Sequence, residues 1–470
     1  MRFSKLLILP ALTLAFAPLR AEVDRTKKPE PGPAPAAAFP DYVTKDLSNG
    51  LKVFVIQDDR KPTITMRMVI RAGEAMDTKA GQAEFVASLL NRGTEKRNAD
   101  AFANEVESLG AQIEASASPD AISIGTSGLV KFTDPLLDLF ADAILHPAFP
   151  EDQFTKEQRR ALSALAAEKK NPAALAGKLQ GKVLFGEHPY GAITTPESVQ
   201  SITREDLVKF HRDWFAPNAA SLAIVGDVSA AEVLPKIEKA FGSWERKEVP
   251  ATKKAPLPKL DGLTIHLLDR PGSVQSNVIV THLAPARNFP DLPEVNVLNS
   301  TLGGGFSGRL FQNLREVHGY TYGSSSAFGY NREAGYFQAT AETRNEVTGA
   351  AIKEILNELR HIRDEAVPED ELELQRQYNI GNYLLSLDQP ARVAARVQDI
   401  WLYDLEPDFY KTYAKRMEAV TPERAQSLAK QYLHPDKLAI VVVGEAKDIR
   451  SDLKKLGKVV SYDTDLKVVK

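Results

Sequence analysis

The chain has 470 residues, 43% of them hydrophobic and 26% charged, a balance that excludes a wholly disordered protein and suggests two to four domains. It contains no cysteine, which excludes disulfides, cysteine-ligated zinc, iron–sulfur clusters and a cysteine nucleophile. The net charge of −3 does not favour nucleic acid as a partner.

The N-terminus has the pattern of a secretory signal peptide, predicted over residues 1–21. Arg2 and Lys5 precede an apolar run that is too short to span a membrane. Cleavage is expected after Ala17 or Ala21; an uncleaved anchor is the alternative. We expect an exported protein, periplasmic if the cell is Gram-negative, with no membrane attachment after cleavage.

Two proline-containing stretches divide the rest of the chain. Residues 22–41 are expected to be a flexible lead-in, and residues 245–259 an interdomain linker. The predicted domains are therefore 42–244 and 260–470.

The first half alternates between strand and helix patterns. Strands are predicted at 53–56, 65–70 and 122–130, and helices at 81–91, 101–109, 135–145 and 157–168. This grouping predicts an α+β fold, with a mixed, mostly antiparallel sheet and helices packed on one face.

The second half repeats the first. A helix start, a proline turn and a glycine after an aliphatic strand each recur 218 residues later, at Thr203 and Thr421, Pro217 and Pro435, and Gly226 and Gly444. So long a period indicates a duplicated domain, because solenoid repeats are about 20–50 residues long.

Three candidate sites are weak. The glycine-rich turn at 302–310 could hold a phosphate, but no Lys-Ser/Thr follows it, so a close-packed turn is favoured. His361 with Glu358 and Glu365 could bind a metal, but the segment is typical of a solvated helix and has no second histidine. His188 is expected only to satisfy a hydrogen bond in a turn.

The segment 313–322 is a stronger candidate. Arg315 lies near the end of a helix that Gly319 should terminate, and a following strand would place Tyr320 and Tyr322 on one face. Arg315 and a tyrosine brought together there would supply two donors for a carbonyl oxygen or a developing oxyanion. The alternative is a surface arginine and a core tyrosine.

With these segments in view, the chain from about residue 42 to 460 resembles the pitrilysin/insulinase family of zinc peptidases, whose smaller members include the mitochondrial processing peptidases. The markers are Asn49-Gly50-Leu51, the helix between Gly81 and Thr94, Asn171-Pro172, His188-Pro-Tyr-Gly191, Val225-Gly226-Asp227, Asp269-Arg-Pro-Gly272 and Arg315…Gly319…Tyr322. The resemblance implies two homologous domains that form half of a clam shell.

The family's zinc motif is degenerate in this chain. Catalytic members resemble one another in carrying His-x-x-Glu-His on the first long helix. At the matching positions Glu84 replaces the first histidine, Ala87 the general base and Ser88 the second histidine. The stretch 162–165, which matches the third ligand, has no carboxylate. We therefore expect no metal and no cofactor in this chain, and no peptidase activity from it alone.

Arg315 and Tyr322 keep the spacing of a pair that, in the family, faces the zinc site and holds the substrate and the oxyanion. The resemblance implies the non-zinc subunit of a heterodimeric metalloendopeptidase, with zinc in a homologous partner and a peptide as substrate. The alternative is an inactive peptidase-like protein with a structural or peptide-binding role, and the resting state could be a homodimer or a heterodimer.

Overall fold

The computed structural model describes residues 38–252 and 255–469, and these residues form one compact unit. The predicted signal peptide and nearly all of the predicted lead-in lie outside the described residues. Within the described ranges, no helix has the length and apolarity that crossing a membrane requires.

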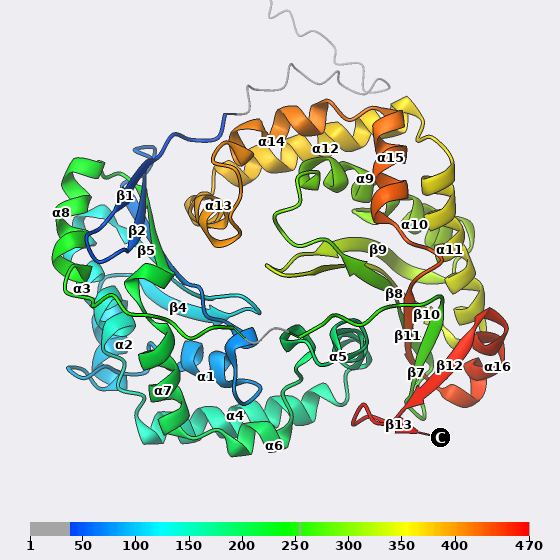
Figure 1. Cartoon of the computed structure of the whole chain (residues 1–470), viewed down its shortest axis with the longest axis horizontal. Helices are drawn as coiled ribbons and strands as arrows, with labels where there is room; N and C mark the ends of the chain where they lie inside the picture. Colours follow the sequence, from blue (N-terminus) through cyan, green and yellow to red (C-terminus); the bar gives the residue numbers. More distant parts are fainter. Residues whose placement is uncertain (1–37, 253–254, 470) are drawn as a thin grey trace, which may run out of the picture. The chain divides into compact units, whose positions relative to one another are not determined.

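The first half is built on a six-stranded sheet in the order β1-β2-β6-β3-β5-β4, in which only β2 and β6 are parallel (Figure 1). Its strands are β1 (Val43–Asp46), β2 (Lys52–Gln57), β3 (Thr63–Ile70), β4 (Gln112–Ala117), β5 (Ile122–Leu129) and β6 (Ala220–Gly226). Its helices are α1 (Gln82–Leu89), α2 (Ala99–Ser108), α3 (Thr133–Leu145), α4 (Glu151–Glu168), α5 (Pro172–Phe185), α6 (Pro196–Ser201), α7 (Arg204–Trp214) and α8 (Ala230–Phe241).

The second half is built on a seven-stranded sheet in the order β13-β12-β7-β11-β8-β10-β9. Its strands are β7 (Thr264–Asp269), β8 (Gln275–Ala284), β9 (Thr321–Gly329), β10 (Gly335–Arg344), β11 (Ala439–Gly444), β12 (Lys458–Tyr462) and β13 (Val468–Val469). Its helices are α9 (Leu292–Gly303), α10 (Arg309–Phe311), the π-helix η5 (Gln312–Val317), α11 (Thr348–Asp364), α12 (Glu369–Leu387), α13 (Pro390–Leu402), α14 (Phe409–Glu418), α15 (Pro422–Tyr432) and α16 (Ala446–Leu456).

The strand orders confirm the duplicated α+β fold. The order β2-β6-β3-β5-β4 in the first sheet corresponds strand for strand to β7-β11-β8-β10-β9 in the second. The repeated helix starts also match, because Thr203 and Thr421 each accept a hydrogen bond from the backbone N–H three residues on and so cap α7 and α15. The predicted helix at 157–168 is longer than expected: α4 begins at Glu151, where two acidic residues favour the first turn.

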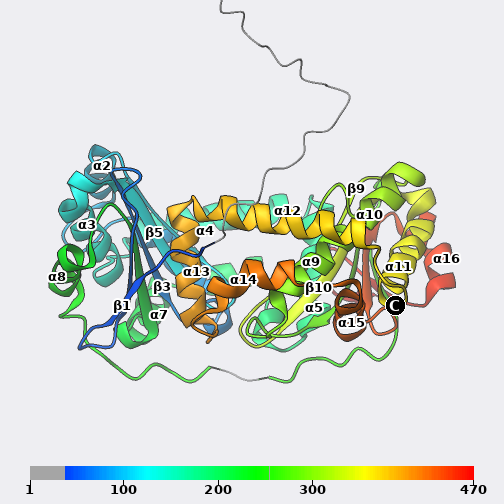
Figure 2. The same cartoon turned by 90° about the horizontal axis from the view of Figure 1, so that it is seen from above.

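Each sheet is covered on one face by helices of its own half, and part of its other face receives a helix from the opposite half. Helix α13 packs on β3 and β6 of the first sheet, whereas α5 packs on β8 and β11 of the second (Figure 1, Figure 2). A buried glutamine occurs at the same place in each helix. Gln398 donates to the backbone oxygens of Arg67 and Ser221, and Gln180 donates to the hydroxyl of Thr281.

Candidate functional site

Arg315 and Tyr322 lie where a helical turn joins the edge strand of the second sheet. Arg315 belongs to η5, and Gly319, with φ +63°, ends the helical segment as predicted. Strand β9 then begins at Thr321. The Nη1 atom of Arg315 donates a hydrogen bond of 3.0 Å to the backbone oxygen of Tyr322. The fold therefore brings the two predicted residues together.

A β-bulge sets the direction of Tyr322. Between the pairs that join β9 to β10 at Thr321 and at Ser324, Tyr322 and Gly323 both lie opposite the single residue Glu342. Bulges of this kind bend a strand and redirect its side chains, often beside active sites. The side chain of Tyr322 is 85% exposed, and its hydroxyl has no hydrogen-bond partner in the part of the chain that the structure describes.

The exposed pair offers two kinds of donor on two residues in contact. Arg315 keeps 45% of its side chain exposed, and its guanidinium also lies 4.9 Å from the ring centre of Phe311. The guanidinium N–H groups and the tyrosine O–H can donate to a peptide carbonyl oxygen or to an oxyanion. The pair has no group that could carry out peptide hydrolysis unaided.

Tyr320 does not share the face of Tyr322, so that prediction was wrong. Tyr320 is half-buried and packs against the core of the second half, with its ring stacked on His318. Its backbone N–H donates to Leu314 of the helical turn. Because the strand begins only at Thr321, the alternation of a strand does not extend back to Tyr320.

The glycine-rich turn lies beside η5 and is close-packed. A Cβ atom on Gly303 would lie 2.7 Å from the backbone nitrogen of Ser326, so only glycine allows this approach of the turn to β9. The side chain of Gln312 donates to the backbone oxygen of Phe306 at 2.8 Å and attaches the turn to η5. The packing supports the interpretation as a close turn.

Helix α1 carries the degenerate motif and is anchored by Asp77. The carboxylate of Asp77 accepts hydrogen bonds from the backbone N–H groups of Gly81 and Ala83, at 2.9 and 2.8 Å. Burial raises the pKa of Asp77 to about 7, although both backbone donors favour its charged form.

Glu84, Ala87 and Ser88 line a polar hollow of about 440 Å³ between α1, β4 and α4. With Glu84 counted, the hollow has three acidic and three basic side chains; the other five are Arg92, Glu114, Lys156, Glu157 and Arg160. Arg160 donates to both carboxylate oxygens of Glu157, at 2.6 and 2.8 Å. The carboxylate of Glu157 is therefore already engaged by a cation of the protein itself.

The residues of this hollow do not fit a zinc ion. Ala87 offers no donor, and the Ser88 hydroxyl donates to the backbone oxygen of Phe85. Glu84, which accepts one weak hydrogen bond from the backbone N–H of Ala117, and Glu114 are the two carboxylates left, whereas a catalytic zinc needs three protein ligands. Across the described residues, no group of three or more histidine, cysteine, aspartate or glutamate side chains is arranged to hold a metal.

The structure also does not make a metal site of Glu358, His361 and Glu365. Glu358 instead accepts a hydrogen bond of 2.6 Å from the side chain of Asn313, while His361 and Glu365 are exposed. This contact between α11 and η5 was not foreseen, since it joins residues 45 positions apart.

His188 is buried in a contact between the two halves. Its Nδ1 accepts from the backbone N–H of Tyr190, as expected for a histidine in a turn, so Nε2 carries the proton and donates to Glu333 at 3.1 Å. Tyr190 in turn donates to Asp120, whose pKa is raised by burial. The cluster connects the halves, and we assign it a structural role.

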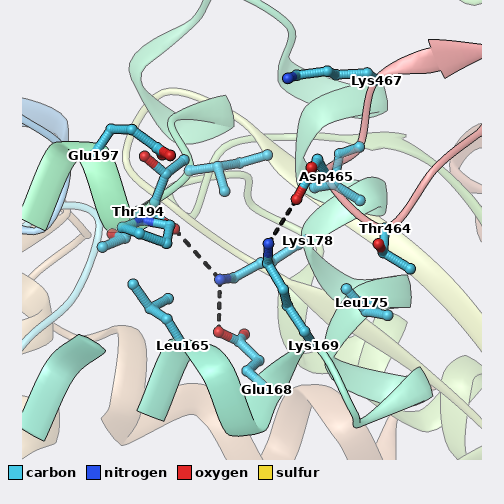
Figure 3. Close-up of a pocket in the computed structure, with 14 residues that line it drawn as sticks. Leu165, Glu168, Lys169, Leu175, Lys178, Thr194, Glu197, Thr464, Asp465 and Lys467 are labelled. Atoms are coloured by element: carbon cyan, nitrogen blue, oxygen red, sulfur yellow. Dashed lines mark hydrogen bonds and ion pairs between the residues drawn. The ribbon is translucent and has the colours of Figure 1, made fainter. Parts of the chain in front are cut away.

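A hollow of about 280 Å³ lies between α4, α5, α6 and the C-terminal turn (Figure 3). Four of its charged side chains form two ion pairs. Lys178 donates to Glu168 and Lys169 to Asp465, both at 2.6 Å (Figure 3). The Lys169–Asp465 pair attaches the C-terminal turn to the first half, and the Lys178–Glu168 pair joins α5 to α4; we assign both a structural role.

Comparison with known proteins decides the family. Residues 52–194 match the model described as Insulinase (Peptidase family M16), and residues 201–379 match the model described as Peptidase M16 inactive domain. The chain belongs to the M16 peptidase family. This confirms the resemblance predicted from its motifs. As an M16 chain without the zinc ligands of the motif, it is a peptidase-like protein of the inactive type.

The M16 relatives cover most of the chain at low identity. An uncharacterized zinc protease of Mycobacterium leprae is 26% identical, over 76% of this chain and 81% of its own length, and one of Bacillus subtilis is 23% identical, over 83% and 95%. The crystal structure of a peptidase M16 inactive domain from Pseudomonas fluorescens matches with a TM-score of 0.80 at 26% identity, covering 86% of this chain and 98% of the other. A protease from Helicobacter pylori shares the fold, with a TM-score of 0.81 at 21% identity over 86% and 100%.

Proposed function

We propose that this M16 chain is the non-zinc subunit of a two-chain peptidase. A homologous partner that carries an intact zinc motif would bind the metal, and this chain would contribute Arg315 and Tyr322 to the shared site. The observation that carries the proposal is the exposed Arg315–Tyr322 pair, which lies in one half of a chain whose own zinc motif lacks a set of three ligands.

The pair would act on a peptide substrate through hydrogen bonds. The zinc of the partner supplies a Lewis acid and an activated water. Arg315 would donate to backbone carbonyl oxygens of the peptide and hold its register. Tyr322 would donate its O–H to the oxyanion that forms as the scissile carbonyl is attacked. Since Tyr322 is 85% exposed in the isolated chain, its hydroxyl is well solvated, and its contribution would increase when partner and substrate exclude water.

The test is reconstitution with the partner, which a tagged pull-down from the exported fraction would recover. We expect Arg315→Ala and Tyr322→Phe each to lower turnover of an unstructured peptide by about 10²–10³, the usual cost of losing one oxyanion donor. Assembly, followed by analytical ultracentrifugation, should not change. Tyr378→Phe is the matched control, because Tyr378 is another exposed tyrosine of the second half.

Full turnover in both variants would remove Arg315 and Tyr322 from the mechanism. A lone chain that binds peptides without zinc or cleavage would instead favour the alternative, an inactive protein with a structural or peptide-binding role.

We further propose that the chain is exported and acts outside the cytoplasm. The charged and apolar pattern of residues 1–21 supports this. Mass spectrometry of the protein from its native cell should find an N-terminus at Pro18 or Glu22, and an intact Met1 in the mature protein would contradict export by cleavage.

A further inference from the structure

Two carboxylates of α11 converge on one amide of η5. The Nδ2 atom of Asn313 donates to Glu358 at 2.6 Å and to Glu354 at 3.3 Å. Glu354 and Glu358 are one helical turn apart, where like charges repel. The amide orientation is set by these acceptors, because a flipped Asn313 would direct its oxygen at two carboxylates.

Asn313 also takes part in the wide turn of η5 through its backbone. The backbone oxygen of Asn313 accepts from the N–H of His318, five residues on, which is the spacing of a π-helix. Its side-chain Oδ1 is buried without a partner among the described residues. A buried acceptor without a partner destabilises the fold, so this arrangement is costly, and π-turns of this kind are frequent at functional sites.

Arg315 lies inside this turn, two residues after Asn313. Its guanidinium reaches the backbone oxygen of Tyr322 from there. The backbone oxygen of Arg315 accepts from Gly319, and that of Leu314 from Tyr320, so the turn also sets where β9 begins. A change in the width of the turn would therefore move Arg315 relative to Tyr322.

We propose that Asn313, held by Glu358 with Glu354 beside it, is the positioning residue for Arg315. The carboxylates of α11 hold the amide, the amide holds the wide turn, and the turn presents the guanidinium beside Tyr322. This inference rests on the proposed function for its catalytic consequence, but the anchoring of the turn can be measured in the isolated chain.

Hydrogen exchange on the full chain tests the anchoring. We expect Asn313→Ala and Glu358→Ala to speed exchange of the His318, Gly319 and Tyr320 amides at least tenfold, with α9 and α12 unchanged. Glu358→Gln keeps an acceptor oxygen and should exchange as the unmodified chain does. Glu365→Gln is the matched control, because Glu365 ends the same helix and does not contact Asn313. Unchanged exchange in Asn313→Ala would overturn the anchoring.

A double-mutant cycle in the reconstituted complex tests the positioning role. Asn313→Ala should lower kcat at least tenfold with little change in assembly, and Asn313→Ala with Arg315→Ala should lose no more than Arg315→Ala alone. Losses that multiply would show that Asn313 acts independently of Arg315 and would overturn the proposal. Full turnover in Arg315→Ala alone is the separate outcome that rejects the proposed function, and with it any catalytic consequence of Asn313.

Discussion

Arg315 and Tyr322 owe their placement to two local irregularities. A π-turn carries the arginine and a β-bulge carries the tyrosine, and both interrupt otherwise regular elements. Each irregularity weakens local hydrogen bonding. The occurrence of one at each member of the pair therefore favours a functional role for the pair over a chance arrangement. By contrast, the residues at the former zinc positions lie on a regular helix and line a hollow whose charges balance.

Also at the residue scale, we predict that His211 makes the protein sensitive to acid. Burial lowers the pKa of His211 to about 4, whereas the unfolded chain accepts the proton near pH 6.5. Stability present at neutral pH is therefore lost as the pH falls from 6.5 towards 4. Urea unfolding measures the free energy of unfolding of the unmodified chain and of His211→Gln at pH 7.5 and at pH 4.5. Between these two pH values the unmodified chain should lose about 2–3 kcal/mol more of this free energy than the variant.

The comparison isolates His211, because the other buried histidines titrate in both proteins. His361→Gln changes an exposed histidine and serves as the control for the loss of a histidine side chain. A difference for His211→Gln that is constant with pH would contradict the prediction.

At the scale of elements, the exchange of α5 and α13 is the main feature of the fold. Each helix packs on a face of the opposite half's sheet, which the helices of that half leave open. The buried glutamines of the two helices are 218 residues apart. The two glutamines are engaged to different extents. Gln398 bonds with the partly buried guanidinium of Arg67 and with two backbone oxygens, whereas Gln180 bonds with one hydroxyl.

This difference predicts unequal costs for the same substitution. Gln398→Ala should lower the unfolding free energy by about 3 kcal/mol, because it removes a charge-assisted hydrogen bond from Arg67 and the donor that serves two backbone oxygens. Gln180→Ala should cost about 1 kcal/mol, the usual value of one neutral hydrogen bond. Urea unfolding of both variants at neutral pH measures the two losses, and equal losses would contradict the argument.

At the scale of the whole molecule, the exchanged helices should make the two halves inseparable while folded. Ion pairs between the halves add to this, among them Arg71 with Asp404 and Arg60 with Asp388. We expect a chain cleaved at a protease site placed between Glu248 and Thr252 to elute as one species from size exclusion in native buffer. The fragments should separate in urea, and separation without denaturant would show that the linker alone holds the halves together.

The duplication and many of the strands and helices were predictable because short sequence patterns mark them. The matched caps at Thr203 and Thr421 and the strands before Gly226 and Gly444 are local patterns, so the repeat could be recognised before any contact was known. The site was only partly predictable. The spacing of Arg315 and Tyr322 indicated the pair, but the error at Tyr320 arose because a bulge and a delayed strand start depend on neighbouring strands.

Residue types and their spacing were enough to predict the duplicated α+β fold, the membership of a peptidase family, the loss of the zinc ligands at Glu84 and Ser88 and the loss of the general base at Ala87. These features are local, and a missing histidine is missing in any conformation. Only the tertiary structure decided that α5 and α13 exchange sheets, that Tyr322 points into solvent and that Asn313 meets Glu358. Those outcomes depend on packing between segments that are distant in the sequence, and local sequence patterns do not show which distant segments will pack together.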